Sequence, residues 1–323
     1  MTDESSARRK WLSLYVGFQA TTIYGVEADR VIVRIVAPLV DRCFERRWIR
    51  RFFYIRYSEL MPHIRLRLLP IEAELADEVR REVEREITSR SPNAVVGRLA
   101  VPEPGTPVLA DDERVANLAW VDYEPEVDRY GGLQALRVAE RFFEDSSKAS
   151  IAMLRSLSDS RSSRLGQSLL QMLIVSHSFA RKAQAAAALS DFFSRSYLPA
   201  LAKRFGGEES TWEEAFSHGF TKQASTLTEY VCDAWERLET GSSLGPAFDV
   251  LVEATQQRAT ELERLVSTGR VIVHGRRCTT WQDAQFALAP SYLHMLCNRN
   301  GTTMAEEAYL ANLMNRALLT SVP

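Results

Sequence analysis

The feature that most constrains the fold of this chain is a change of periodicity near residue 132. Upstream of it, stretches with the two-residue period of a strand alternate with stretches of helical period, whereas downstream almost every stretch has the helical period. The upstream order is strand, helix, strand, strand, helix, strand, over residues 10–18, 25–47, 52–57, 63–69, 71–90 and 94–101. This order is typical of a ferredoxin-like β-α-β-β-α-β unit. We therefore expect an α+β fold in which a sheet-containing part precedes a mostly helical part.

Helix-breaking and turn-forming residues refine this outline. Pro38 lies inside the helical stretch 25–47 and should kink or break it, because proline has no N–H to donate. The stretch 102–113 is rich in proline, glycine and aspartate, which predicts a loop, and residues 116–125 then supply an extra strand. The expected layout is a single domain, 1–323, with a sheet-containing subregion 1–130 and a helical subregion 131–323.

Composition excludes several classes of function. The 40 basic and 42 acidic side chains give a net charge of −2, so no broad basic field favours direct nucleic-acid binding. No apolar run is long enough to span a membrane, and the polar N-terminus does not resemble a signal peptide, so we expect a cytoplasmic protein. The 4 cysteines form no CxxC pair, and phosphate-loop and dinucleotide motifs are missing from the sequence. We expect neither a metal nor a cofactor.

A first candidate for chemistry is "PHIRLRL", residues 62–68. Read as a strand, it places His63, Arg65 and Arg67 on one face and aliphatic side chains on the other. Arginines two strand positions apart, about 7 Å, can hold carboxylates through charge-assisted hydrogen bonds. Taken alone, the pattern is more typical of a solvated strand face with its charges outward.

A second candidate is "YEPEVDRYGG", residues 123–132. Glu126 and Arg129 follow the extra strand, and the pair Gly131–Gly132 opens the next helix. Glycines there permit close backbone approach and can leave N–H groups at a helix N-terminus for an anion. A local Glu–Arg ion pair that stabilises a turn is an equally good interpretation of this segment.

A third candidate is "APSYLHMLCNRNG", residues 289–301. On a helix, Ser291, His294 and Asn298 share one face. A histidine in such a position can act as a general acid or base near neutral pH. A lone helical histidine is more often satisfied by a structural neighbour, so this segment alone does not establish a site.

Together, the ordered segments resemble the C-terminal domain of the lantibiotic dehydratases, which is also found as free-standing thiopeptide-type bacteriocin biosynthesis proteins. The matching segments are 11–15, 52–57, 62–67, 123–132, 140–146 and 294–299. The resemblance implies β-elimination of glutamate from glutamylated serine or threonine in a ribosomally made precursor peptide of leader plus core, leaving dehydroalanine or dehydrobutyrine. It also implies a partner, a separate tRNA-dependent glutamylating subunit, so that the chain is the elimination half of a split dehydratase; a homodimer is a further expectation.

The resemblance assigns roles to the residues found above. The implied catalytic residues are His294, Arg65, Arg67 and Arg129. The implied substrate-binding residues are Glu126, Tyr123, Tyr130, Ser291, Asn298 and Arg299. His294 would move the proton, the arginines would hold the glutamyl carboxylate and stabilise enolate and leaving-group charge, and Glu126 would pair with the glutamyl ammonium or orient an arginine.

Two other activities are compatible with the same resemblance. Pyridine synthases of this family join two dehydroalanines by aza-cycloaddition, close a macrocycle and release the leader peptide. In that group the arginine strand often follows "YW-x-x-GPH", whereas this chain has "RYSELMPH" and keeps every elimination-type residue, which favours elimination. The remaining alternative is a non-catalytic protein that binds the precursor, for which a histidine beside an anion site would serve no purpose.

Overall fold

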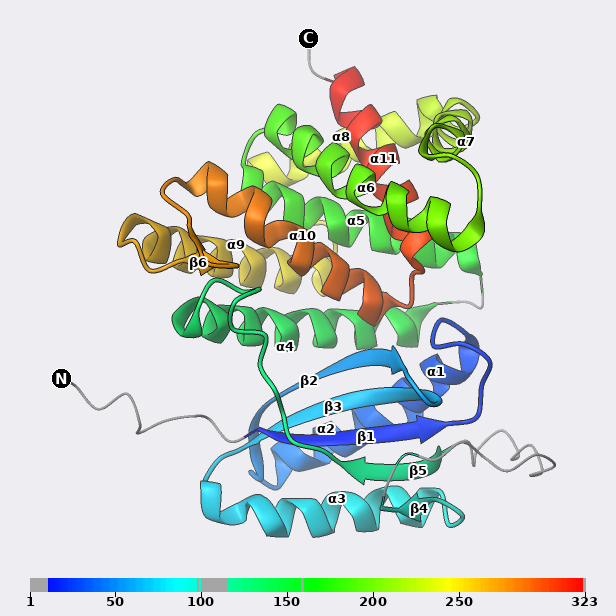
Figure 1. Cartoon of the computed structure of the whole chain (residues 1–323), viewed down its shortest axis with the longest axis vertical. Coiled ribbons are helices and arrows are strands. Elements are labelled where there is room, and N and C mark those ends of the chain that lie inside the picture. Colours follow the sequence, from blue (N-terminus) through cyan, green and yellow to red (C-terminus); the bar gives the residue numbers. More distant parts are fainter. Residues whose placement is uncertain (1–10, 98, 100–114, 158–159, 322–323) are drawn as a thin grey trace. The chain divides into compact units, whose positions relative to one another are not determined.

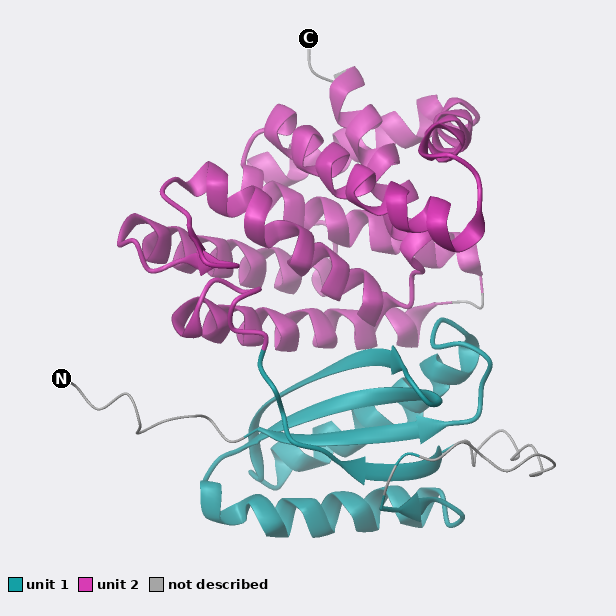
Figure 2. Cartoon of the chain, viewed as in Figure 1, with its two compact units in different colours: residues 1–125 teal, residues 126–323 magenta. Residues whose placement is uncertain are grey.

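The computed structural model describes residues 11–97, 99, 115–157 and 160–321, and it divides into two compact units, Met1–Pro125 and Glu126–Pro323 (Figure 2). The first unit contains a five-stranded sheet and the second is almost entirely helical (Figure 1). The α+β class, with the sheet first, is therefore confirmed. The unit boundary lies close to the predicted limit of the sheet-containing subregion, whereas the single domain over 1–323 stays a prediction.

In the first unit the strand order is β2-β3-β1-β5-β4. All neighbours pair antiparallel except β4, which is parallel to β5. The helices α1 and α2 lie behind the sheet in the view of Figure 1. The elements are β1 (Leu12–Phe18), α1 (Val26–Val31), a π-helical segment (Ile32–Val36), α2 (Ala37–Glu45), β2 (Ile49–Ser58), β3 (Pro62–Pro70), a short 3-10 turn (Ala73–Leu75), α3 (Ala76–Arg90), β4 (Val95–Val96) and β5 (Val115–Trp120).

The ferredoxin-like arrangement is confirmed, but a different strand closes it. The position beside β1 belongs to β5 and not to the predicted strand 94–101, whose residues Val95 and Val96 pair with β5 at the sheet edge. Residues 98, 100 and 101 and the predicted loop 102–113 lie outside the described residues. β5 lies inside the sheet between β1 and β4, whereas β4 is an edge strand. Val115 and Leu118 of β5 are buried accordingly, whereas Val95 and Val96 are exposed.

Pro38 does not end the helical path. The chain is helical from Val26 to Glu45, and the regular α pattern is replaced by π-helical hydrogen bonding at Ile32–Val36, just before the proline. Pro38 then lies in the first turn of α2, directly after the π-helical segment, and because it has no N–H the preceding turn lacks one helical hydrogen bond. The predicted interruption is therefore a π segment in an otherwise continuous helix.

The second unit packs its helices around α5, whose residues from Ser168 to Ser176 are all buried. In Figure 1, α10 (orange) and α11 (red) meet at a short turn, and α6 runs beside α11. The elements are α4 (Leu133–Ser156), α5 (Arg161–Ala180), α6 (Ala183–Phe205), α7 (Glu209–Thr221), α8 (Ala224–Thr240), α9 (Pro246–Ser267), the hairpin β6 (Ile272–Val273) and β7 (Arg276–Arg277), α10 (Trp281–Asn300) and α11 (Met304–Ser321).

Candidate functional site

The strand register of the first unit gathers aromatic side chains around the two predicted arginines. Arg65 lies opposite Tyr15 of β1, and its guanidinium carbon is 3.4 Å from the ring centroid of Tyr57 and 4.8 Å from that of Tyr15. Arg67 has its guanidinium carbon 5.4 Å from the ring centroids of both Tyr15 and Tyr123. Guanidinium groups at these distances gain cation–π attraction. We call Tyr15, Tyr57, Arg65, Arg67 and Tyr123 the arginine–tyrosine cluster.

Arg67 is a desolvated cation. Its residue is only 5% exposed, and burial lowers its pKa, an effect that the phenols of Tyr15 and Tyr123 offset only in part. Within the described part of the chain, its Nε and Nη1 are buried and have no hydrogen-bond partner. Buried donors without partners are costly and rare. Arg67 is therefore not a solvated surface charge, and its two unpaired nitrogens can donate to an oxygen atom.

His63 and Arg65 share a local network on the same face. His63 is fully buried, and its Nδ1 lies 2.9 Å from the carbonyl oxygen of Met61, so Nδ1 carries the proton. The other ring nitrogen, Nε2, then accepts a hydrogen bond from Arg65 Nε at 3.3 Å. Burial lowers the pKa of His63, which keeps the ring neutral beside two arginines. A second Arg65 nitrogen pairs with Glu59 at 3.1 Å.

In the second unit, the turn before α4 ties Arg129 to α10. Arg129 Nη1 donates to both carboxylate oxygens of Glu126 at 3.3 Å, and its Nε donates to Ser291 Oγ at 3.0 Å, across 162 residues of sequence. Burial lowers the pKa of Arg129, but the neighbouring Tyr130 and Glu126 outweigh this and raise it. The structure thus brings three predicted site residues from two distant segments into contact.

The two glycines in this turn are required by the backbone conformation and by close packing. Gly131 and Gly132 have φ values of 85° and 99°, which favour glycine, and a Cβ on Gly131 would lie 2.8 Å from Val271 Cγ1. The N–H of Gly132 donates to Val127 O at 2.9 Å. The prediction that this glycine pair offers free N–H groups to an anion is therefore wrong for Gly132, because the turn itself uses that group.

His294 is joined by two residues that the sequence did not single out. Its Nδ1 lies 2.9 Å from Glu307 Oε2 and 3.0 Å from the hydroxyl oxygen of Tyr197. The Tyr197 hydroxyl donates to the same Glu307 oxygen at 2.8 Å. The carboxylate side chain is 2% exposed, whereas the imidazole is 36% exposed. We call Glu126, Arg129, Tyr197, Ser291, His294 and Glu307 the α10 cluster.

The side chains of three further predicted residues are buried among the packed helices. Arg299 is fully buried, donates from Nε to Ser147 Oγ at 3.0 Å and from Nη1 to Met295 O at 2.7 Å, and covers the ring of Phe143. Tyr130 also packs on Phe143, and burial raises its pKa to about 12. Asn298 is buried as well. A direct contact of these three side chains with substrate stays a prediction.

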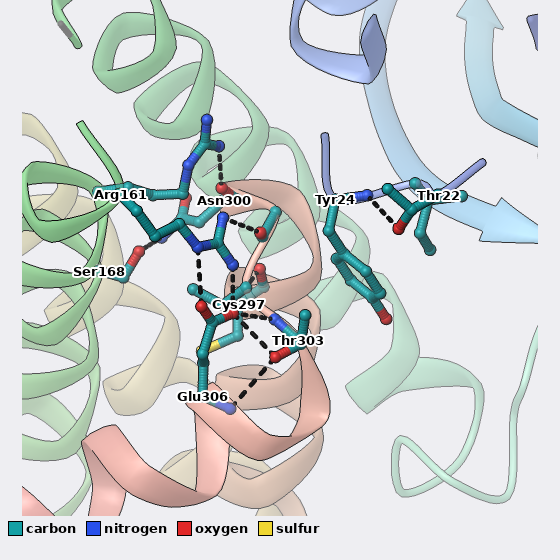
Figure 3. Close-up of polar contacts among 12 residues, drawn as sticks. Thr22, Tyr24, Arg161, Ser168, Cys297, Asn300, Thr303 and Glu306 are labelled. Carbon is teal, nitrogen blue, oxygen red and sulfur yellow. Dashed lines mark hydrogen bonds and ion pairs between the residues drawn. The ribbon is translucent and has the colours of Figure 1, made fainter. Parts of the chain in front are cut away.

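A polar network fixes the corner between α10 and α11 (Figure 3). Arg161 of α5 donates to Glu306 Oε1 at 2.7 Å and to Gly301 O at 3.0 Å. Thr303 donates from its backbone N–H and its hydroxyl to Glu306 Oε2, both at 2.8 Å. Asn300 donates to Ser168 Oγ at 3.3 Å. The corner therefore holds fixed the two helices that carry His294 and Glu307.

Other features of the described residues do not coincide with these clusters. A cavity of about 470 Å³ beside the β6–β7 hairpin is lined by His274, Arg276, Cys278 and Phe286 among others, and by none of the predicted site residues. In the described ranges, no group of three or more potential metal ligands occurs. A helix of the length and apolar character needed to cross a bilayer is likewise missing from the part of the chain that the structure describes.

The family model described as "Lantibiotic biosynthesis dehydratase C-term" matches residues 11–318. No curated protein sequence matches the chain.

Three solved structures share the fold. TsrL is 15% identical with a TM-score of 0.66, and the match covers 97% of this chain and 95% of TsrL. The pyridine synthase TbtD from thiomuracin biosynthesis is 14% identical with a TM-score of 0.68, covering 96% and 98%. The tRNA-dependent lantibiotic dehydratase MibB from Microbispora sp. 107891 is 19% identical with a TM-score of 0.62, covering 99% of this chain but 29% of MibB.

Proposed function

The chain belongs to the lantibiotic biosynthesis dehydratase C-terminal family, and we propose that it eliminates glutamate from glutamylated serine or threonine of a precursor peptide. The observation that carries this proposal is the half-exposed His294 whose Nδ1 contacts the buried Glu307, within one cluster with Arg129 and Glu126. Such an arrangement supports proton transfer beside an anion-binding group.

The elimination makes two demands on the protein. A base must take the Cα proton, the electron pair of that C–H bond then forms the Cα=Cβ double bond, and the Cβ–O bond breaks with its electrons leaving on the glutamate carboxylate. Cationic donors must stabilise the negative charge that develops on the peptide carbonyl and on the leaving group. We assign the base to His294, through the ring nitrogen Nε2 that is not engaged by Glu307.

The arginines are proposed to supply the cationic donors. Arg67 supports this role because two of its buried donors lack a partner in the described residues. Arg65 is stacked between two tyrosines, which limits the conformational freedom that substrate binding would otherwise remove. Arg129 keeps its charge beside Glu126, whose carboxylate is proposed to accept a hydrogen bond from the glutamyl ammonium.

In this proposal a separate tRNA-dependent subunit supplies the glutamyl ester, the partner that the sequence resemblance implies. The cytoplasmic location and a homodimer likewise stay predictions.

A glutamylated precursor peptide tests the proposal directly. We expect the purified protein to release free glutamate and to leave a peptide lighter by the mass of glutamic acid, and we expect His294→Ala to abolish this. An intact glutamyl ester after incubation with the wild-type protein, at concentrations where peptide binding is saturated, would contradict elimination.

Pyridine synthesis is the second candidate. The match to the pyridine synthase TbtD spans nearly the whole of both chains, whereas the match to MibB spans under a third of MibB. A fully dehydrated, azole-bearing peptide separates the two activities, because a pyridine synthase converts it to a macrocycle and releases the leader. Macrocycle formation from this peptide, with the glutamylated peptide untouched, would replace the elimination proposal.

A further inference from the structure

Three helices of the second unit contribute to a compact hydrogen-bonded triad. Tyr197 comes from α6, His294 from α10 and Glu307 from α11, and each of the three donor–acceptor distances lies between 2.8 and 3.0 Å. The Glu307 side chain is 2% exposed, so its carboxylate depends on these partners for hydrogen bonds. The partly exposed His294 and the buried Glu307 therefore form a hydrogen-bonded pair in which the carboxylate orients the ring.

Hydrogen-bond accounting fixes where the protons of the triad lie. Burial, reinforced by Glu307, raises the pKa of Tyr197, so the phenol keeps its proton and donates it to Glu307 Oε2. A carboxylate only accepts hydrogen bonds. If Nδ1 of His294 carried a lone pair, it would face the same oxygen at 2.9 Å and repel it. Consistent pairing therefore places a proton on Nδ1, and in the neutral ring the lone pair then lies on Nε2.

Other charged groups around the triad do not compete for this carboxylate. Arg129 is near enough to Tyr197 for the phenol to raise the arginine pKa, but Arg129 donates hydrogen bonds to Glu126 and Ser291. Glu306, the neighbour of Glu307 in sequence, is bound by Arg161 and Thr303. The thiol of Cys297 is fully buried. Burial, and to a smaller extent the nearby Glu307, raise the pKa of this thiol, so it stays neutral.

We infer that Glu307 is the positioning residue that holds His294 with its proton on Nδ1 and so presents Nε2 as the base. The inference rests on the proposed elimination for its catalytic consequence, but the tautomer itself is independent of any reaction. A carboxylate hydrogen-bonded to the far nitrogen of a histidine both orients the ring and stabilises the imidazolium that forms when Nε2 takes a proton.

The substitution Glu307→Leu tests this inference because it removes the carboxylate but leaves the Tyr197 hydroxyl 3.0 Å from Nδ1. Without the carboxylate to accept its proton, the hydroxyl can donate to Nδ1, which favours the opposite tautomer, with the proton on Nε2. We expect ¹⁵N NMR of the histidine rings to show the Nδ1–H tautomer of His294 in the wild type and Nε2–H in Glu307→Leu, with His294→Ala identifying the signal. No substrate is needed for this measurement.

Kinetics of glutamate release complete the test. We expect kcat of Glu307→Leu to fall on the order of 100-fold with KM little changed, since general-base catalysis contributes about 10²- to 10⁴-fold. Glu263→Leu is the matched control, because it removes a partly exposed carboxylate of α9 that pairs with Arg181. That variant should keep the wild-type kcat, and thermal unfolding of both variants verifies the fold.

The outcomes separate this inference from the proposed function. If wild-type protein releases glutamate but Glu307→Leu keeps both the Nδ1–H tautomer and the wild-type kcat, the positioning role is wrong and elimination stands. If no glutamate is released by any variant while the tautomer changes as expected, elimination is wrong and the positioning of His294 by Glu307 stands.

Discussion

The guanidinium carbon of Arg65 lies 3.4 Å from the ring centroid of Tyr57, which is on the neighbouring strand, and 4.8 Å from the ring centroid of Tyr15. The cation is held between two aromatic faces, with Glu59 as a charged partner at 3.1 Å. Aromatic stacking fixes the direction of a guanidinium without neutralising its charge. The arginine–tyrosine cluster is therefore a rigid group of cations and not a set of flexible surface charges.

Removing the Tyr57 ring tests whether this stacking matters for activity. Cation–π contacts contribute about 0.5–2 kcal/mol, so Tyr57→Ala should lower kcat/KM for glutamate release by about 2- to 30-fold. Tyr57→Phe keeps the ring and should stay close to the wild type. Equal losses in the two variants would assign the effect to the hydroxyl group and contradict a stacking role.

Arg67 should contribute to activity at the expense of stability. It is a buried cation with donors that have no partner in the described residues, and such groups are costly. Arg67→Met fills a similar volume without the charge, so we expect the free energy of unfolding to rise by about 1–3 kcal/mol. Glutamate release should fall by about 10²- to 10³-fold, as when a donor to developing charge is removed.

Urea denaturation measures the first effect and mass spectrometry the second. Arg50→Met on the same sheet is the control, because Arg50 is exposed, and it should change neither quantity. A destabilised but fully active Arg67→Met protein would contradict both parts of this prediction.

Two glycines with the same positive φ allow the effect of the close contact at the α4 turn to be measured separately from the effect of the backbone conformation. Gly131 and Gly206 both have φ of 85°, but a Cβ on Gly131 would meet Val271 Cγ1 at 2.8 Å, whereas one on Gly206 would meet nothing within 4 Å. Gly206→Ala should cost about 1–2 kcal/mol for the left-handed conformation alone. Gly131→Ala should cost about 1–3 kcal/mol more for overpacking, measured by chemical denaturation. Equal costs would show that the turn relaxes away from Val271.

Local patterns predicted the arginine strand correctly because side-chain direction along a strand depends only on residue parity. The same parity places Tyr15 and Tyr57 beside those arginines once the strands are paired. Burial was not predictable in this way, because a solvated face and a face covered by tyrosines have the same alternation. The strand that closes the sheet was also mistaken, since two short apolar stretches compete and only non-local pairing with β1 decides between them.

The α10 cluster shows the same limit. The spacing of Ser291 and His294 on one helix face is a local property and was predicted from the sequence. Glu307 follows Glu306 at the start of a helix, where acidic residues are common and need no functional reason. Only the packed corner shows that Glu306 faces Arg161 while Glu307 faces His294.

The stability of the α10–α11 corner should depend on pH through Glu306. Burial raises the pKa of this carboxyl, but hydrogen bonds from Arg161 and Thr303 outweigh it and hold the pKa below its ordinary value. A carboxyl with a depressed pKa in the folded state stabilises the protein above its unfolded pKa, about 4.3, and loses that contribution as the pH falls through the folded pKa. Glu306→Gln should therefore be less stable than the wild type near neutral pH, and the difference should shrink below about pH 4.3. Urea midpoints across this range measure the difference, and a constant gap at all pH values would exclude ionised Glu306 as its source.

Replacing Tyr197 with phenylalanine separates the two partners of His294. The variant removes the hydroxyl that donates to Glu307 Oε2 at 2.8 Å but leaves the carboxylate beside Nδ1. Because the carboxylate alone is enough to require a proton on Nδ1, the ring NMR signals of His294 should keep the wild-type tautomer. A hydrogen bond to a charged group contributes about 1.5–3 kcal/mol, and its loss should loosen Glu307 and lower kcat by roughly tenfold, at the lower end of that range. A change to the Nε2–H tautomer in Tyr197→Phe would mean that the phenol, and not Glu307, fixes the proton of His294.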